Sequence, residues 1–286
     1  MAEARRHVAL QKSFGVDVSV LDPHGVRELC PYLHTDDLAG ATYTPRDGFA
    51  DPYLATTAIA ARARGLGVTI RLAEAVQGFV RDGSRVTGVV TAKETVHAGA
   101  VVVATGCWSG NVGTLAGVDI PVVPYRRHKF ITAPFPTDNI PARTPFIIDM
   151  AQAISLRREG EGVLLGIGRA DDGGHFDTEI DRSLEPLIVE RAVHRAPALA
   201  DAQLMRGWAG LYEMTPDQTG IVSAVDGVAG LYVIAGFSGH GFMHGPIAGE
   251  LMAELITGAP PSIDIAPLAL SRFAAGRAER ESLTFV

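Results

Sequence analysis

Residues 230–256 combine two apolar stretches with a glycine-rich turn that holds two histidines. Leu231–Ala235 predicts a short buried strand, and residues 246–257 predict a helix that begins near Pro246 and ends before Gly258. A strand, a glycine turn and a helix bring backbone amides and the positive end of a helix against an electron-rich ligand. Glycine is needed there because a Cβ would block the approach. The segment therefore indicates either a ligand-binding turn or a buried strand–turn–helix without a ligand.

Other polar side chains could act in such a site, and each has a plainer structural interpretation. His240 and His244 could line a cavity or bond only to the backbone. Arginine binds carboxylates through two parallel hydrogen bonds, so any of four arginines could hold a substrate carboxylate or simply lie on the surface. They are Arg126, Arg127, Arg169 and Arg206. Glu213 and Asp217 could cap a turn. No residue spacing indicates a metal site or a serine or cysteine triad.

The composition limits the class of protein. The 286 residues are 47% hydrophobic and 20% charged, which is ordinary for a globular protein that buries a sizeable core. The net charge of −7 argues against nucleic acid as a main partner, since phosphate binding needs a basic surface. Apolar runs such as residues 98–106 are shorter than the roughly 20 residues of a membrane span, and residues 1–15 lack a signal-peptide pattern. We expect a soluble, cytoplasmic protein.

The order of predicted elements indicates an α/β region, then an antiparallel sheet, then a second α/β region. A helix over residues 53–64 and a strand over 68–72 form an αβ unit. An apolar strand over 101–104 leads into a Thr-Gly turn, at the strand end where α/β sheets bind ligands. Residues 122–168 predict strands separated by turns. A cleft between two interleaved regions would be a favoured site for a small molecule.

Four segments together resemble one group of flavoenzymes. They are DGFADPYLATTAIAARARGLGV, VVVATGCWSG, RGWAGLYEMTPDQTGIV and GLYVIAGFSGHGFMHGPIAGE. They are similar to the D-amino-acid-oxidase-like FAD oxidoreductases, particularly the branch of sarcosine oxidase β-subunit, glycine oxidase and proline or dimethylglycine dehydrogenase. The resemblance implies a mixed α/β fold, in which a partial, Rossmann-like FAD-binding domain is interleaved with an antiparallel-sheet substrate domain. The FAD-binding domain would comprise residues 46–117 and 216–261, the substrate domain residues 14–45 and 118–215, and a C-terminal tail residues 262–286.

The resemblance also implies roles for individual residues. Val76 would meet the adenine of FAD, and Thr105 and Gly106 would lie beside its ribityl chain and pyrophosphate. Tyr212 would lie at the face shared by flavin and substrate. The catalytic candidates are Tyr212 and His240, and the candidate substrate contacts are Tyr125 and Arg126. The loop under the flavin would consist of Gly236, Phe237, Ser238, Gly239, His240, Gly241, Phe242 and Met243.

Three departures from the family pattern bear on this expectation. Family members begin with a strand–turn–helix that carries GxGxxG for the FAD pyrophosphate, and this pattern does not occur in the 286 residues. Gly210 occupies the position at which some oxidases attach flavin through a cysteine, which excludes that linkage. Met243 replaces a lysine that some oxidases place near the flavin, and this favours a dehydrogenase over an oxidase.

The resemblance predicts an FAD-dependent oxidoreductase that oxidises the C–N bond of a small secondary amine or amino acid. A hydride from the carbon beside the nitrogen would pass to flavin N5, and the resulting imine would hydrolyse. Sarcosine, dimethylglycine, proline and glycine are the expected kinds of substrate. The alternative is a non-catalytic fragment, or a subunit that needs a partner chain to complete the nucleotide-binding site. A partner subunit or a homo-oligomer would then be the expected assembly.

Overall fold

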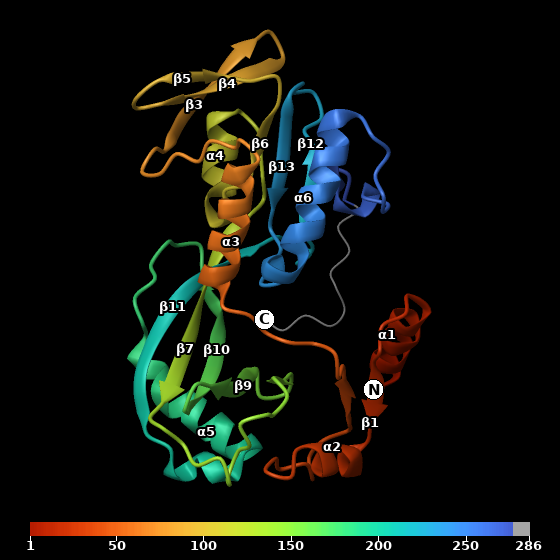
Figure 1. Cartoon of the computed structure of the whole chain (residues 1–286), viewed down its shortest axis with the longest axis vertical. Helices are drawn as coiled ribbons and strands as arrows, with labels where there is room; N and C mark the ends of the chain where they lie inside the picture. Colours follow the sequence, from red (N-terminus) through yellow and green to blue (C-terminus); the bar gives the residue numbers. More distant parts are fainter. Residues whose placement is uncertain (277–286) are drawn as a thin grey trace.

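The computed structural model describes residues 1–276, and its helices and strands form an elongated molecule with two halves (Figure 1). The α-helices are α1 (Ala2–Ser13), α2 (Pro23–Leu29), α3 (Pro52–Gly65), α4 (Ser109–Leu115), α5 (Glu185–Arg195) and α6 (Gly241–Thr257). The strands are β1 (Ser19–Leu21), β2 (Ala41–Tyr43), β3 (Val76–Asp82), β4 (Arg85–Thr91), β5 (Thr95–His97), β6 (Val101–Val103), β7 (Val123–Thr132), β8 (Ile147–Asp149), β9 (Ile154–Glu159), β10 (Gly162–Gly173), β11 (Leu204–Met214), β12 (Ile221–Ala224) and β13 (Leu231–Ala235). The mixed sheets and helices confirm the predicted fold class.

The upper half in Figure 1 is built around a three-stranded sheet with the order β12-β13-β6. β13 and β6 are parallel, with Leu231 opposite Val101, so both strands end at the same edge of the sheet. The Thr-Gly turn follows β6 and the glycine turn follows β13. The topology therefore brings the two turns that the sequence marks as ligand-binding to one place. β3, β4 and β5 form a separate antiparallel sheet at the top of this half.

The lower half contains a five-stranded antiparallel sheet with the order β11-β7-β10-β9-β8. Because side chains alternate along a strand, Phe130 on β7 and its neighbours Leu165 and Ile154 lie on one face, where they pack against Ile188 of α5. α2 and the loop after it add further buried side chains to this core. We call the opposite face of the sheet the open face. It carries Tyr125, Arg127 and Lys129 of β7 and Tyr212 of β11.

Two predicted elements differ from the structure. Residues 68–72 do not form a strand, because no strand in the described part of the chain lies beside them to share hydrogen bonds, and Val68 and Leu72 are exposed. The helix expected from Pro246 begins earlier, at Gly241, so Pro246 lies in its second turn. There it removes the amide that would donate to the Phe242 carbonyl.

The tail after α6 packs back onto the upper half. Residues 262–276 contain two short 3-10 turns, Ala266–Leu268 and Leu270–Arg272, and no α-helix. Leu268 packs against the cluster that includes α6, and Leu270 against the core of the β12-β13-β6 sheet. The rest of the predicted tail, residues 277–286, lies outside the described residues. Among residues 1–276, none of the helices has both the length and the apolar character needed to cross a lipid bilayer.

Candidate functional site

The glycine turn after β13 packs against the end of β11. Gly236 and Gly239 have positive φ angles of 77° and 95°, a conformation that other residues rarely adopt. A Cβ on Gly239 would lie 2.4 Å from the Tyr212 ring, and a Cβ on Gly236 would lie 2.3 Å from the Thr215 side chain. Both glycines are therefore required by packing within the protein. The structure places Tyr212 directly against the loop predicted to bind the flavin.

The Glu213 carboxylate lies close to three glycines of this site. Its carboxylate accepts a hydrogen bond of 3.0 Å from the Gly236 amide. A Cβ on Gly106 would lie 3.6 Å from this carboxylate, and a Cβ on Gly241 would lie 3.4 Å from it. Burial raises the pKa of Glu213, and hydrogen bonds from the turn amides lower it only in part. Glu213 therefore bonds to the turn after β13 and lies close to the turn after β6 and the start of α6, which is not the turn cap that the sequence suggested.

The open face of the lower sheet holds a buried arginine between two tyrosines. The guanidinium carbon of Arg127 lies 5.7 Å from the centre of the Tyr125 ring and 5.4 Å from that of Tyr212. Gly168 and Gly210 lie opposite Arg127 on the neighbouring strands, and a Cβ on Gly168 would lie 2.3 Å from the arginine side chain. Burial lowers the pKa of Arg127, although nearby acidic groups and tyrosines counteract this effect.

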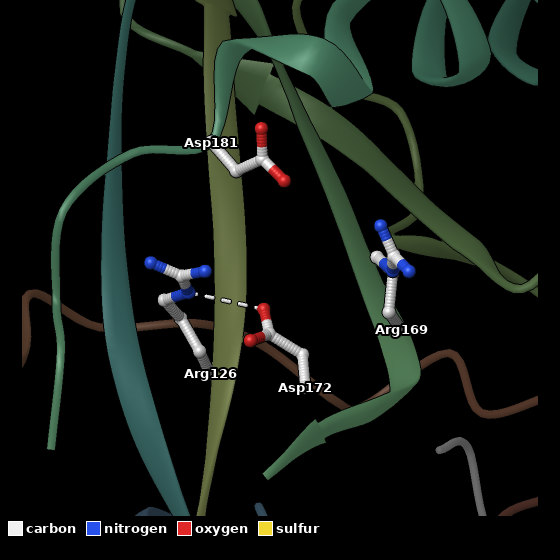
Figure 2. Close-up of a pocket in the computed structure, with 4 residues that line it drawn as sticks. All are labelled: Arg126, Arg169, Asp172 and Asp181. Carbon is white, nitrogen blue, oxygen red and sulfur yellow. Dashed lines mark hydrogen bonds and ion pairs between the residues drawn. The ribbon is translucent and has the colours of Figure 1, made fainter. Parts of the chain in front are cut away.

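Arg126, the arginine expected to contact substrate, lies on the other face of the sheet. Its Nε donates to Asp172 at 3.0 Å, and its Nη1 bonds to Asp177 and to the Glu179 carbonyl. Figure 2 shows Arg126, Asp172 and two further side chains around a small polar cavity of about 220 Å³. The structure thus separates Arg126 from Tyr125 and Tyr212. The neighbour that it brings to those tyrosines is Arg127.

Asp172 is the centre of a charged network beside this cavity. Its carboxylate accepts hydrogen bonds from Arg126, from the fully buried His128 at 3.3 Å and from His175 at 2.9 Å. Burial raises the pKa of Asp172, but these three hydrogen bonds outweigh it and lower the pKa to about 2. The carboxylate is therefore ionised and fully engaged, which indicates a structural role.

The other predicted site residues occupy varied environments. Gly106 has a positive φ of 52° at the turn after β6, and the Thr105 hydroxyl lies 3.2 Å from that of Ser109. In the loop after β13, Phe237 and Ser238 are buried, His240 precedes α6 with no capping hydrogen bond from its side chain, and Phe242 and Met243 are exposed. Val76 is the first residue of β3.

One group of side chains outside this region could hold a metal ion. Among the described residues, His34, Asp37 and His194 place ligand atoms within 4.8 Å of one another. Arg195, however, donates to both carboxylate oxygens of Asp37, at 2.9 and 3.1 Å. These ion pairs neutralise the carboxylate and fasten the loop after α2 to the end of α5.

Comparisons with known proteins agree with this geometry. The family model described as FAD dependent oxidoreductase (DAO) matches residues 1–255. The chain is 31% identical over 281 residues to the sarcosine oxidase subunit beta of an Arthrobacter species, covering 96% of this chain and 68% of that subunit. It is 28% identical over 269 residues to a D-amino acid dehydrogenase of Bradyrhizobium diazoefficiens, covering 93% of this chain and 63% of that enzyme.

Solved structures show the same likeness over nearly the whole chain. The L-proline dehydrogenase of P. horikoshii matches with a TM-score of 0.88 and 30% identity, over 97% of this chain and 74% of that one. The glycine oxidase of Geobacillus kaustophilus matches with a TM-score of 0.81 and 26% identity, over 95% of this chain and 71% of that one. With an antiparallel sheet, an αβ half and a glycine turn in the expected places, the chain belongs to the DAO family of FAD-dependent oxidoreductases.

Proposed function

We propose that this chain forms the flavin- and substrate-facing part of an enzyme that oxidises the C–N bond of a small amino acid or secondary amine. The relatives above are named for sarcosine, D-amino acids, proline and glycine. The observation that carries the proposal is the convergence of the glycine turn, Glu213 and Tyr212 at the end of a sheet face that bears a buried arginine. Such a convergence of polar groups is typical of small-molecule sites.

The residues beside the glycine turn fit the flavin end of FAD. α6 begins at Gly241, and the amides of its first turn have no partner within the helix, so this end favours a negatively charged ligand. Gly249 has open space where a Cβ would lie, and Phe242 and Met243 expose apolar surface beside it. The pyrophosphate end has no matching GxGxxG turn in the 286 residues.

FAD, when bound, supplies the hydride acceptor. This chain's own contribution would be orientation: Gly239 packs against the Tyr212 ring, and Glu213 holds the glycine turn against the end of β11. Met243, where some related oxidases have lysine, supports dehydrogenase chemistry with an electron acceptor other than oxygen.

A second candidate function is that of a subunit whose nucleotide site is completed by another segment. α3 has no buried residue, and apolar side chains are exposed on it and on the segment that follows. We call this the α3 surface; its residues are Tyr53, Leu54, Ile59, Leu66, Val68 and Leu72. β6 is also an edge strand of its sheet in the described part of the chain. An unpaired strand edge and exposed apolar side chains each favour burial against a partner, such as a strand–helix unit carrying GxGxxG.

The first experiment is a titration of the purified chain with FAD, followed by flavin fluorescence and near-UV circular dichroism. For an enzyme active alone, we expect one-to-one binding and anaerobic bleaching of the flavin by one of sarcosine, dimethylglycine, proline or glycine. For a subunit, FAD should bind only after a GxGxxG-bearing partner chain is added. Absence of binding under both conditions would contradict both proposals.

A further inference from the structure

Lys129 is a partly buried cation on the open face of the lower sheet. Its Nζ lies 3.2 Å from the Ser155 hydroxyl. A lysine ammonium carries three donor hydrogens. Among the residues that the structure describes, this ammonium has neither a second hydrogen-bond partner nor an ion pair with a carboxylate. Removing a charge from water costs free energy unless the charge is paired, so the unused donors indicate a place for a ligand.

The residues around Lys129 form a small site on the open face. Gly166 lies opposite Lys129 on β10, and Ser155 lies opposite Gly166 on β9. A Cβ on Gly166 would lie 2.3 Å from the Lys129 Nζ and 2.4 Å from the Ser155 Oγ, so both polar groups lie over the glycine. Trp208, opposite Lys129 on β11, is 44% exposed and adds apolar surface on the same face. We call these four residues the Lys129 site.

The charges near the Lys129 site favour an anion. Arg157 on β9 is paired with Glu159, at 2.5 Å. Its charge and the burial of Lys129 together lower the pKa of Lys129 to about 8. At neutral pH the ammonium is therefore still mostly protonated. Arg127, two residues away on β7, adds a second positive charge to the same face and forms no ion pair with a carboxylate of the described residues.

The Lys129 site lies on the same face as the proposed flavin position, but farther along the sheet. Tyr125 lies opposite Tyr212, which packs against the glycine turn, and Arg127 and Lys129 follow at alternate positions of β7. A strand rises about 3.3 Å per residue, so Lys129 lies roughly 7 Å beyond Arg127. Sarcosine, proline and glycine are too short to extend from the flavin to this site. A ligand that reaches it needs a chain of several carbon atoms.

We propose that Lys129 and Ser155 bind a carboxylate at the far end of the substrate. The inference rests on the proposed function and narrows it: the substrate is an amino acid whose side chain or nitrogen substituent ends in a carboxylate, several carbons from the C–N bond that is oxidised. The ammonium and the hydroxyl would each donate a hydrogen bond to this carboxylate. Trp208 would contact the apolar chain that leads to it.

The test measures ligand binding without relying on catalysis. Ligand-observed NMR on the full chain, with and without FAD, compares both enantiomers of 2-aminoadipate with those of homoglutamine, its uncharged amide of equal length. We expect 2-aminoadipate to bind more tightly. Lys129→Met should weaken its binding by about 10- to 100-fold, the usual effect of a hydrogen bond between charged groups, and leave homoglutamine unaffected. Ser155→Ala should have a smaller effect, about 2- to 10-fold.

The pH dependence of binding separates a charge at Lys129 from a role in packing. In the unmodified chain, the preference for 2-aminoadipate over homoglutamine should decline as the pH rises above about 8, because Lys129 then loses its proton. The comparison cancels the titration of the amino group that the two ligands share. Lys129→Arg stays charged over this range, so its preference should not change with pH.

Thermal unfolding and a matched variant supply the controls. Because Lys129 is a partly buried charge without a carboxylate partner, Lys129→Met should leave the ligand-free Tm unchanged or raise it. Lys12→Met, on an exposed position of α1, should alter neither the Tm nor the binding. Binding of homoglutamine as tight as that of 2-aminoadipate would overturn the inference. So would absence of binding by both ligands, or a preference that survives Lys129→Met.

The outcomes also distinguish this inference from the proposed function. If 2-aminoadipate binds through Lys129 but no amino acid reduces bound flavin, the Lys129 site stands and the proposed oxidation fails. If flavin is reduced equally well by amino acids with and without a distal carboxylate, the oxidation stands and the role of Lys129 is wrong.

Discussion

At the scale of single residues, the site depends on positions where no side chain can be accommodated. Gly239 combines a positive φ with a tyrosine ring where a Cβ would lie, and Gly236 combines a positive φ with the Thr215 methyl group at that place. The Glu213 carboxylate then accepts a hydrogen bond from the Gly236 amide of this turn. The loop is consequently held by its backbone geometry and by the Glu213 carboxylate.

Replacing Gly239 by alanine should therefore destabilise the protein. The Cβ would strain the backbone and displace the Tyr212 ring, and together these effects should lower the free energy of unfolding by roughly 2 kcal/mol or more. Urea-induced unfolding, followed by circular dichroism, measures the change. Gly249→Ala in α6 is the matched control, since its Cβ meets open space, and it should stabilise by about 0.5–1 kcal/mol. Equal effects of the two substitutions would contradict the packing argument.

At the scale of elements, a buried ion pair fastens the tail to the site. Asp217, which caps the turn after β11 through the Thr219 amide at 3.1 Å, also accepts from Arg272 at 2.7 and 3.1 Å. Both partners are buried. Burial raises the pKa of Asp217, but the hydrogen bonds from Arg272 and Thr219 outweigh it, so the pKa lies below its ordinary value. The tail residue Arg272 thus stabilises the turn that precedes β12.

Arg272→Met should lower the free energy of unfolding by about 3–5 kcal/mol, because it leaves the Asp217 carboxylate buried and unpaired. The double variant Arg272→Met/Asp217→Asn should recover part of this loss. Urea unfolding of the single and double variants at neutral pH gives both values. If the free energy of unfolding falls no further in Arg272→Met than in the double variant, Arg272 and Asp217 are not energetically coupled.

The same pair predicts how stability depends on pH. A carboxyl whose pKa is lower in the folded state binds its proton more readily when unfolded. Its contribution is therefore fully present above the unfolded value of about 3.9 and is lost as the pH falls below it. Unfolding between pH 5 and 2 should show a steeper loss of stability in the unmodified chain than in Asp217→Asn.

At the scale of the whole molecule, several large apolar side chains are exposed on α3 and just after it. The α3 surface consists of large exposed apolar side chains on α3, which buries none of its residues, and on the segment that follows it. Exposed apolar side chains in such number favour an interaction site. The chain also spans 68% and 63% of the two relatives aligned with it.

Leu54→Glu combined with Ile59→Glu should reduce the binding of a hydrophobic fluorescent dye and the concentration-dependent association of the chain. Both side chains are 64% exposed, so the Tm should change little. Leu10→Glu on α1, at a side chain that is 58% exposed, is the control and should leave dye binding nearly unchanged. Equal effects of the two variants would mean that the α3 surface is not distinct from the rest.

Much of the fold follows from local patterns. An aspartate directly before a proline is typical of a helix start, and in the structure Asp22 and Asp51 each accept a hydrogen bond of 2.8 Å from the amide three residues on. The antiparallel strands of the lower sheet were recognisable from their turns. The alternation along β7 also implies that Tyr125 and Arg127 share a face and that Arg126 lies on the other, as the structure shows. The substrate role of Arg126 stays a prediction.

What the sequence by itself determined is the set of features that depend on neighbours within a few residues: helix caps, strand alternation and the glycines of the turn. The tertiary structure alone decided which face of the lower sheet α5 covers, and that Arg127 on the open face is buried with its Nη2 unpaired. It also decided that residues 68–72 form no strand and that Glu213 bonds to a turn 23 residues away. These outcomes depend on contacts between distant segments, which no local pattern encodes.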